Sequence, residues 1–507
     1  MSFSEARVLA IGLDAAEPTL IRELIEQGEM PALKALLEQG KWLRVESPAS
    51  VGSGSVWPTF ITGEEPSIHG VYGEWCWRPA TMSLERYRGD GLIPFWKRLV
   101  DNGLTVGILD VPFAPLVGIA DGFEISEWGP HDLLKGQLEF FPPEITEIVK
   151  QQTSPHPLSS DRLDAAGPMD YDGLRKLSVG CLEGVKLRGA LAYELINKRR
   201  PRLSLITFTE IHHSAHYLWH NIVPAHEIYD QSSSLKKPAS VKPTLKEIYC
   251  EVDRQIGALV TIAAADAVLV FSLHGMQASH GIPSFLGPLL CEKGFARLAA
   301  WGDQSWFGRA VTLMGAIKRR TPAALKKLYY KSITPGAAQR FARPTMIPEY
   351  DWNNTYAFSL PTDQHGWIRI NLRGREACGI VAPEEYQQTC QQLEQLLHSL
   401  TTAEGRPLVR RVTRSAKNAD GHALLSLPDL VVHWENAAFS SPLKIQGSGV
   451  SIPAAGTKFT GQHSLEGFCI IRGSGDFRES DCVHVRDLGQ VISTMLKSPL
   501  SLGQDPP

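Results

Sequence analysis

Residues 50–70 read SVGSGSVWPTFITGEEPSIHG, and we take the rest of the chain to be organised around this segment. Residues 52–55 are small, so a charged group can approach the backbone, and their hydroxyls can act as nucleophiles. Residues 56–62 are apolar enough to begin a buried helix, and Pro58 is tolerated in its first turn. A hydroxyl just before a helix lies where backbone N–H groups favour an anion. The same pattern is also that of an ordinary capping loop, so the segment alone leaves both interpretations open.

The hydrophobic pattern around this segment predicts an α/β fold. Residues 8–13 are a nearly continuous apolar run that ends at Asp14, as in a central parallel strand that delivers a carboxylate at its carboxyl end. We expect further strands at residues 104–109, 203–208, 267–271, 427–432 and 468–471. We expect helices at residues 18–27, 30–37, 247–264, 383–400 and 485–496. The chain therefore predicts a mostly parallel sheet flanked by helices.

Length and composition exclude several classes of protein. With 507 residues the chain can bury a large core, and its net charge of −3 argues against a binder of nucleic acid polymers. Its eight cysteines are scattered without a CxxC pair, which is typical of reduced thiols. The first residues do not resemble a signal peptide, and no apolar run approaches the length of a bilayer span. We therefore expect a cytoplasmic protein without a membrane partner.

A histidine-rich segment follows the expected strand at residues 203–208. Residues 210–220 contain Glu210 and four histidines. His212 and His216 are four residues apart, so they share one face if the segment is helical. Neutral imidazoles in this arrangement suit a zinc ion, and the sequence therefore predicts a metal site here.

The spacing around Ser53 carries a resemblance to a known family. Ser53 lies ten residues before Gly63 of a Thr-Gly pair, and PSIHG follows at residues 66–70. This arrangement resembles the nucleophile segment of the type I phosphodiesterase/nucleotide pyrophosphatase family, in the alkaline phosphatase superfamily. The strand, acid and helix at the start of the chain, with MPAL at residues 30–33, are similar to the start of that family. The resemblance implies that Ser53 is the nucleophile, with Ser55 as the alternative.

The resemblance also implies a first metal site. In the family an Asp and a His four residues later bind this metal, and a late His in a G-x-H turn completes the ligands. His216 and His463 match the two histidines of that pattern. His212 stands where the family has the Asp, which leaves His212 or Glu210 as the third ligand. We expect zinc at this site.

A second metal site beside the nucleophile is implied by the same resemblance, with Asp14, Ser53 and His274 as ligands. Leu273 stands where most relatives have a carboxylate, so this site is one charge and one ligand short. The candidates for the missing ligand are Glu210, Asp363 and water. Zinc is expected here too, with Mn²⁺ or Mg²⁺ as alternatives. Without the resemblance, Asp14 would also suit a helix N-cap near Glu17.

The function implied by the resemblance is a metal-dependent phosphoester hydrolase of the phosphodiesterase or phosphatase type. Ser53 would attack the phosphorus of a small-molecule substrate and form a covalent phosphoseryl intermediate. A phosphoryl transferase is one alternative, and a phosphate-ligand binder with a degenerate second metal site at Leu273 is another. The sulfatase signature, a Cys or Ser followed by x-Pro-x-Arg, is absent around Ser53.

The domain organisation follows from where these patterns occur. Residues 1–111, 200–282 and 350–498 are expected to form the alkaline phosphatase-like core. Residues 112–199, which are rich in Pro and Gly, and residues 283–349, which are expected to be helical, are assigned to insertions that form a cap. Residues 499–507 are expected to be a tail. Arg369 and Arg375 suit either a substrate anion or pairing with a carboxylate.

Overall fold

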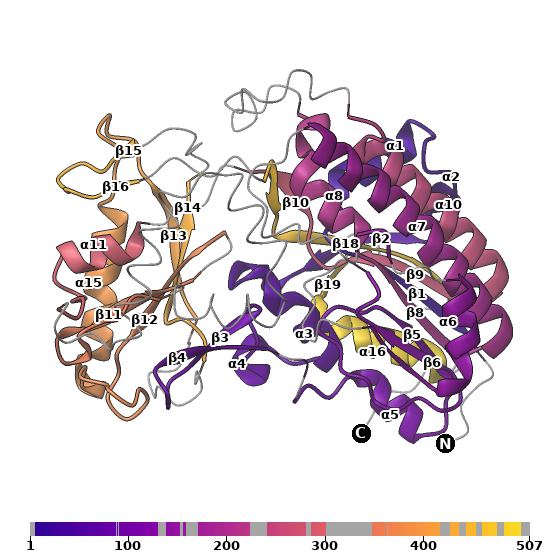
Figure 1. The fold of residues 1–507 in the computed structure, drawn as a ribbon, viewed down its shortest axis with the longest axis horizontal. Helices are drawn as coiled ribbons and strands as arrows, with labels where there is room; N and C mark the ends of the chain where they lie inside the picture. The colour runs from indigo at the N-terminus through magenta and orange to yellow at the C-terminus, as the bar shows by residue number, and fades with distance from the viewer. Residues whose placement is uncertain are drawn as a thin grey trace.

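The computed structural model describes residues 6–87, 89, 91–129, 138–152, 156–158, 171–223, 241–279, 285–300, 347–361, 364–415, 426–435, 443–452, 459–473 and 481–497. A large α/β part lies at the right of Figure 1, and a smaller part built on an antiparallel sheet lies at the left. The predicted α/β class is confirmed.

The larger part is built on a nine-stranded sheet with the order β19-β2-β18-β9-β1-β8-β5-β6-β7. Its strands are β1 (Val8–Leu13), β2 (Lys41–Glu46), β5 (Val106–Leu109), β6 (Phe123–Ser126), β7 (Glu139–Phe141), β8 (Leu203–Phe208), β9 (Ala267–Ser272), β18 (Glu466–Arg472) and β19 (Cys482–His484). In this sheet β7 and β18 run opposite to the other strands. The sheet is therefore mostly parallel, as the sequence predicts.

Two layers of helices cover the sheet, because side chains along each strand alternate between its faces. In β1, Val8 and Ala10 belong to one core, and Leu9 and Ile11 belong to the other. The second core is covered by α1 (Pro18–Glu26), α2 (Pro31–Glu38), α6 (Thr146–Gln152), α7 (Tyr171–Arg199), α8 (Glu210–Leu218) and α10 (Leu245–Ala263). The first core is covered by α3 (Val56–Thr62), α5 (Phe95–Asp101) and α16 (Val485–Lys497), and α4 (Pro66–His69) packs beside α3.

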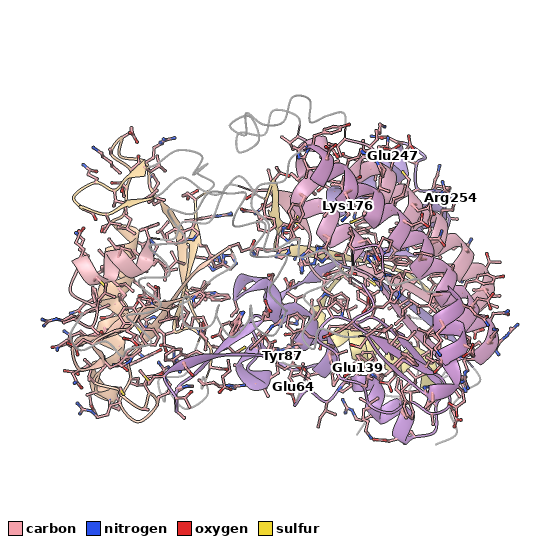
Figure 2. All side chains as sticks on the ribbon, in the orientation of Figure 1. Glu64, Tyr87, Glu139, Lys176, Glu247 and Arg254 are labelled. Atoms are coloured by element: carbon pink, nitrogen blue, oxygen red, sulfur yellow. The ribbon has the colours of Figure 1, made fainter. Side chains whose placement is uncertain are left out.

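The outer faces of these helices are polar. Figure 2 shows Lys176 on α7, and Glu247 and Arg254 on α10, at the upper right of the molecule. All three residues are exposed, whereas the apolar residues of the same helices face the sheet. This amphipathic pattern is the reason that α10 was predictable from its sequence.

The described parts of residues 112–199, which the sequence analysis assigns to an insertion, lie in and against the central sheet. Strands β6 and β7 extend the central sheet beyond β5, and α7 packs against α8 and α10 in the helix layer. The strands were missed because they are only four and three residues long. Runs this short show no hydrophobic period.

The smaller part contains a four-stranded antiparallel sheet with the order β11-β12-β14-β13. Its elements are β11 (Ala357–Leu360), β12 (Gly366–Ile370), β13 (Val409–Arg414), β14 (Leu430–Trp434), α11 (Leu286–Glu292) and α15 (Tyr386–His398). The sequence analysis assigns residues 350–498 to the core, and the strands within residues 357–434 form this separate sheet. Of the segment 283–349, α11 packs against β11, while residues 301–346 and the expected tail at 499–507 lie outside the described residues.

Buried ion pairs hold the smaller part together. Arg369 is fully buried and donates to Glu376 at 2.7–2.8 Å, while Arg375 makes two bonds of 2.7 Å to Asp429. Both arginines therefore have the structural role that the sequence analysis gave as one of two alternatives. Burial opposes ionisation of Asp429, but Arg375, Arg369 and a backbone N–H together hold the pKa of Asp429 below its usual value.

Short elements complete the chain. They are the strands β3 (Trp75–Arg78), β4 (Ser83–Arg86), β10 (Met276–Ala278), β15 (Leu443–Lys444), β16 (Ser451–Ile452) and β17 (Gly461–His463), and the 3-10 helices η1 (Pro48–Ser50), η2 (Ser53–Ser55), η3 (Pro143–Ile145), η4 (Trp219–Asn221), η7 (Trp352–Asn354) and η8 (Pro383–Glu385). Among the described residues, no helix combines the length and the apolar character that a bilayer span requires.

Candidate active site

The candidate residues meet at the edge of the central sheet where its parallel strands end. Asp14 follows β1, α8 follows β8, and His274 follows β9, and these three strands are neighbours in the sheet. Strand β18 is antiparallel, so its beginning lies at the same edge. The preceding strand β17 pairs with β10, which sets His463 opposite Met276. The topology therefore brings together residues that are more than 400 positions apart.

Three histidines form the centre of the site. His212 and His216 lie one turn apart on α8, and their Nε2 atoms are 2.9 Å apart. The Nε2 atom of His463 lies 3.1 Å from that of His216 and 2.9 Å from that of His212. The three nitrogens thus form a nearly equilateral triangle.

The partners of the other ring nitrogens define which atoms carry protons. Nδ1 of His212 lies 2.7 Å from Oδ2 of Asp14, and Nδ1 of His216 lies 3.0 Å from the carbonyl oxygen of Gly461. A carboxylate and a carbonyl only accept hydrogen bonds, so both Nδ1 atoms donate. In the neutral rings both Nε2 atoms then present lone pairs to one another. Such a convergence of lone pairs is stabilised by a cation.

The titration of His216 agrees with this arrangement. Burial disfavours its imidazolium form, and the neighbouring His212 adds to this effect, so the pKa of His216 is lowered to about 3. His216 is therefore neutral at physiological pH. The neutral ring is the form that binds metals.

The three histidines fit a zinc ion. Nitrogens at about 2.0–2.1 Å from a tetrahedral zinc are about 3.3 Å apart, close to the 2.9–3.1 Å between these Nε2 atoms. Histidine ligands of zinc commonly donate the other N–H to a carboxylate or a carbonyl, as His212 and His216 do. His212, His216 and His463 are also a group that could hold a metal by the spacing of their ligand atoms.

Glu210, the alternative to His212 as a ligand, lies against Arg188 and apart from the three histidines. Its side chain is fully buried, and its two oxygens accept from Nε of Arg188 at 3.0 and 3.1 Å. His156 donates to the same carboxylate at 3.2 Å, and Asp110 also pairs with Arg188. Burial opposes ionisation of Glu210, but Arg188 and His156 together hold the pKa of Glu210 below its usual value. Of the two alternatives, His212 is therefore the one that joins His216 and His463.

Asp14 occupies a central position between the sheet and the nucleophile segment. Its Oδ1 atom accepts from Nε1 of Trp57 at 2.8 Å, and its Oδ2 atom accepts from His212. Nε2 of His274 lies 4.0 Å from Oδ1 of Asp14, and the His274 ring is 4.6 Å from that of His463. Asp14 and His274 thus lie within 4.6 Å of a member of the histidine triangle.

The position of the missing carboxylate is apolar in the structure as well. Leu273 is 1% exposed and belongs to the hydrophobic core that also contains Trp57. Of the substitutes considered from the sequence, Glu210 is bound to Arg188, and Asp363 lies outside the described residues.

The nucleophile segment forms η2, which continues directly into α3. Ser55, the alternative nucleophile, is fully buried. Its hydroxyl donates a hydrogen bond to the carbonyl oxygen of Gly52 at 2.7 Å. Ser53 is partly exposed and lies one turn before Trp57, whose indole bonds to Asp14. The 3-10 helix that carries Ser53 thus runs directly into the helix whose Trp57 contacts Asp14.

The smaller part of the molecule holds the start of this segment. Nε1 of Trp367 donates to the carbonyl oxygen of Val51 at 2.7 Å, and Nε2 of His365 donates to that of Ala49 at 3.0 Å. A Cβ atom on Gly52 would lie 2.6 Å from the Trp367 ring, so the close approach requires glycine here. The position of Ser53 therefore depends on both parts of the protein.

The sequence analysis missed three residues of this region. Trp57 was taken only as apolar, although its indole bonds to Asp14. Trp367 has no local signal that predicts its partner. Glu17 was considered only in connection with a helix cap, but its Oε2 atom also accepts from the backbone of Met276 at 2.9 Å and from Ser464 at 3.1 Å. It thus ties together the loops that carry His274 and His463.

Comparisons with known proteins agree with this arrangement. The sequence profile of the family described as type I phosphodiesterase / nucleotide pyrophosphatase matches residues 8–441. The crystal structure of phosphonoacetate hydrolase from Sinorhizobium meliloti 1021 in complex with phosphonoformate is similar, with a TM-score of 0.53, 15% identity and 97% of each chain covered. The complex of that protein with phosphonoacetate gives the same values.

A murine ectonucleotide pyrophosphatase / phosphodiesterase 5 structure has a TM-score of 0.46 and 11% identity, with 98% of this chain and 97% of that chain covered. No curated protein matches the sequence. At 15% identity, the likeness to phosphonoacetate hydrolase shows a shared fold. The family profile extends over most of the chain, and the protein therefore belongs to the type I phosphodiesterase/nucleotide pyrophosphatase family.

Proposed function

We propose that the protein is a metal-dependent hydrolase of small-molecule phosphoesters in which Ser53 is the nucleophile. His212, His216 and His463 would hold a zinc ion. The observation that carries this proposal is the triangle of Nε2 atoms 2.9–3.1 Å apart, two of which present lone pairs to one another. Family membership supplies the class of reaction.

A continuous set of contacts connects the proposed nucleophile to the proposed metal. Trp57, one turn after Ser53, bonds to Asp14, and Asp14 bonds to His212. Each of these contacts involves a buried or half-buried side chain, so their geometry is held by packing. Fixed geometry matters here because phosphoryl transfer depends mainly on positioning and on positive charge near the phosphoryl oxygens.

The reaction would proceed in two steps. Oγ of Ser53 bonds to phosphorus while the bond to the leaving alcohol breaks, and the alcohol leaves with one proton. Water then attacks the phosphoseryl group, which restores the Ser53 hydroxyl and releases phosphate or a phosphomonoester. A bound zinc ion would supply positive charge beside the phosphoryl oxygens during both steps.

The cysteines support a location in the cytoplasm. All eight are free thiols, and each lies in the described part of the chain. Four of them are buried, and burial raises the pKa of the Cys469 thiol to about 12. Thiols of this kind are typical of proteins from reducing compartments.

Matched serine variants test the proposal. Zinc-replete wild type, Ser53→Ala and Ser55→Ala are assayed with p-nitrophenyl phosphate and its bis ester, and their metal content is measured. We expect Ser53→Ala to lose at least about 10³-fold in kcat, the scale seen for a lost nucleophile, with unchanged metal content. Ser55→Ala should keep most of its turnover, because its hydroxyl only bonds to the backbone.

The intermediate gives a second readout. Acid quenching of the wild type during turnover should leave a phosphoryl group on the peptide that contains residue 53. Turnover by Ser53→Ala at the wild-type rate would show that Ser53 is the wrong residue. A wild type that binds metal but hydrolyses neither ester, nor transfers phosphate to an added alcohol, would favour a phosphate-ligand binder.

A further inference from the structure

The second metal site implied by the family does not fit the residues present. This site would use Asp14, Ser53 and His274 together with a carboxylate at position 273. Leu273 is 1% exposed and packs in the hydrophobic core, so this position offers no ligand atom. Among the described residues, Asp14 would then be the one carboxylate of the site, although divalent cations with oxygen ligands usually have several.

The carboxylate of Asp14 is already engaged on both oxygens. Oδ1 accepts from the indole N–H of Trp57 at 2.8 Å, and Oδ2 accepts from Nδ1–H of His212 at 2.7 Å. Trp57 is 3% exposed, so a cation that displaced its N–H would leave a buried donor without an acceptor. Displacing His212 would release the hydrogen bond that directs its Nε2 lone pair at His216 and His463.

Asp14 instead has the position of an outer carboxylate of the histidine centre. A carboxylate that accepts from the distal nitrogen of a histidine ligand fixes the tautomer and the ring orientation, and it raises the basicity of the ligand. The bond of 2.7 Å between Asp14 and His212 has this geometry. Trp57 holds the same carboxylate from the nucleophile segment, so a single residue orients both the metal ligand and the helix that carries Ser53.

We propose that the protein binds one metal ion, at His212, His216 and His463, and that Asp14 is a positioning residue for that ion and not a ligand of a second one. This proposal rests on the proposed function, because it takes the three-histidine metal as bound. Three neutral imidazoles leave the double positive charge of the ion to act on the phosphoester. The negative charge of Asp14 lies behind His212, to which it is hydrogen-bonded, and not on the ion itself.

Metal stoichiometry and affinity test the proposal on the full-length protein. Metal-free wild type, Asp14→Asn, Trp57→Phe and His216→Ala are dialysed against buffered free Zn²⁺ and measured by elemental analysis. We expect one equivalent in the wild type and in Asp14→Asn, with affinity lowered 10- to 100-fold in Asp14→Asn, the scale for a lost outer-sphere partner. His216→Ala should hold no tightly bound zinc.

Two further variants separate positioning from ligation. Trp57→Phe retains the carboxylate but removes one of its donors, so it should keep one equivalent with a smaller loss of affinity than Asp14→Asn. His274→Ala should keep one equivalent at the wild-type affinity, because the proposal assigns it no metal. If Asp14→Asn fails to fold, the number of zinc ions bound by the wild type still decides between one metal site and two.

Two equivalents in the wild type, falling to one of unchanged affinity in Asp14→Asn or His274→Ala, would overturn this inference and leave the proposed function intact. No bound zinc in an active wild type would overturn both. One equivalent in a wild type that has no phosphoesterase activity would support the single-ion centre while removing the proposed function.

Discussion

Glu210 distinguishes the three-histidine centre from the alternative in which a carboxylate precedes His216 as a ligand. The structure places Glu210 against Arg188, with two bonds of 3.0 and 3.1 Å, in a fully buried position. Glu210→Gln keeps the size of the side chain and removes its charge. We therefore expect this variant to lose stability and to keep its metal.

The expected loss follows from the hydrogen bonds involved. A hydrogen bond to a charged group contributes about 1.5–3 kcal/mol, and one between neutral groups contributes about 0.5–1.5 kcal/mol. The Nε–H of Arg188, which both oxygens share, and the N–H of His156 each bond to this carboxylate. Each of these two donors should lose about 1 kcal/mol, which gives a total of about 2 kcal/mol. The larger loss of about 3–5 kcal/mol that follows when a buried charge is left alone does not apply, because Asp110 still pairs with Arg188 at 2.8 Å.

The assay is denaturant unfolding of the metal-loaded wild type, Glu210→Gln and a matched control, with elemental analysis of each. The control is Glu183→Gln on α7, whose pair with Lys186 is 3.8 Å long and about half exposed. This control should change the free energy of unfolding by no more than about 0.5 kcal/mol. The reasoning is refuted if Glu210→Gln unfolds like the wild type but loses its zinc.

Three further predictions concern the second part of the molecule, the pH dependence and the metal. Trp367→Phe removes the N–H that bonds to the carbonyl of Val51, and a loss of about 1 kcal/mol in positioning should lower kcat about fivefold in steady-state assays, with unchanged zinc content. The pKa of Asp429 is depressed in the folded state, so its contribution to stability is present above its unfolded pKa and is lost as the pH falls through its folded pKa. Denaturation of Asp429→Asn between pH 7 and pH 3 should therefore show a weaker dependence on pH than that of the wild type, and an equal dependence would contradict the assignment. Protein in free Zn²⁺ at 1,000 times the Kd should be more stable than chelator-treated protein by about 4 kcal/mol in the free energy of unfolding. His216→Ala should show no such difference in the same denaturation assay.

Most of the central sheet was predictable because long buried strands have a strong local signature. Strands β1, β8 and β9 are continuous apolar runs within one or two residues of the predicted bounds. Strands β6 and β7 are short and lie in a segment rich in Pro and Gly, so their place in the sheet depends on pairing with β5 and with each other. Pairing partners that are distant in sequence leave no local pattern.

The candidate site was predictable as a set of residue types but not as a set of contacts. The spacing of His212 and His216 places both on one helical face, and the structure confirms that they meet. The choice between His212 and Glu210 depended on Arg188, which lies on another helix and pairs with the Glu210 carboxylate. The bond between Trp57 and Asp14 joins two segments that no short motif connects.

Anomalous X-ray diffraction from zinc-loaded crystals, recorded on both sides of the zinc absorption edge, tests the histidine centre most directly. We expect a peak bonded to the Nε2 atoms of His212, His216 and His463, with Asp14 bonded to Nδ1 of His212 and outside the coordination sphere. A zinc peak whose ligands include Glu210, or one that none of these three histidines contacts, would contradict the account.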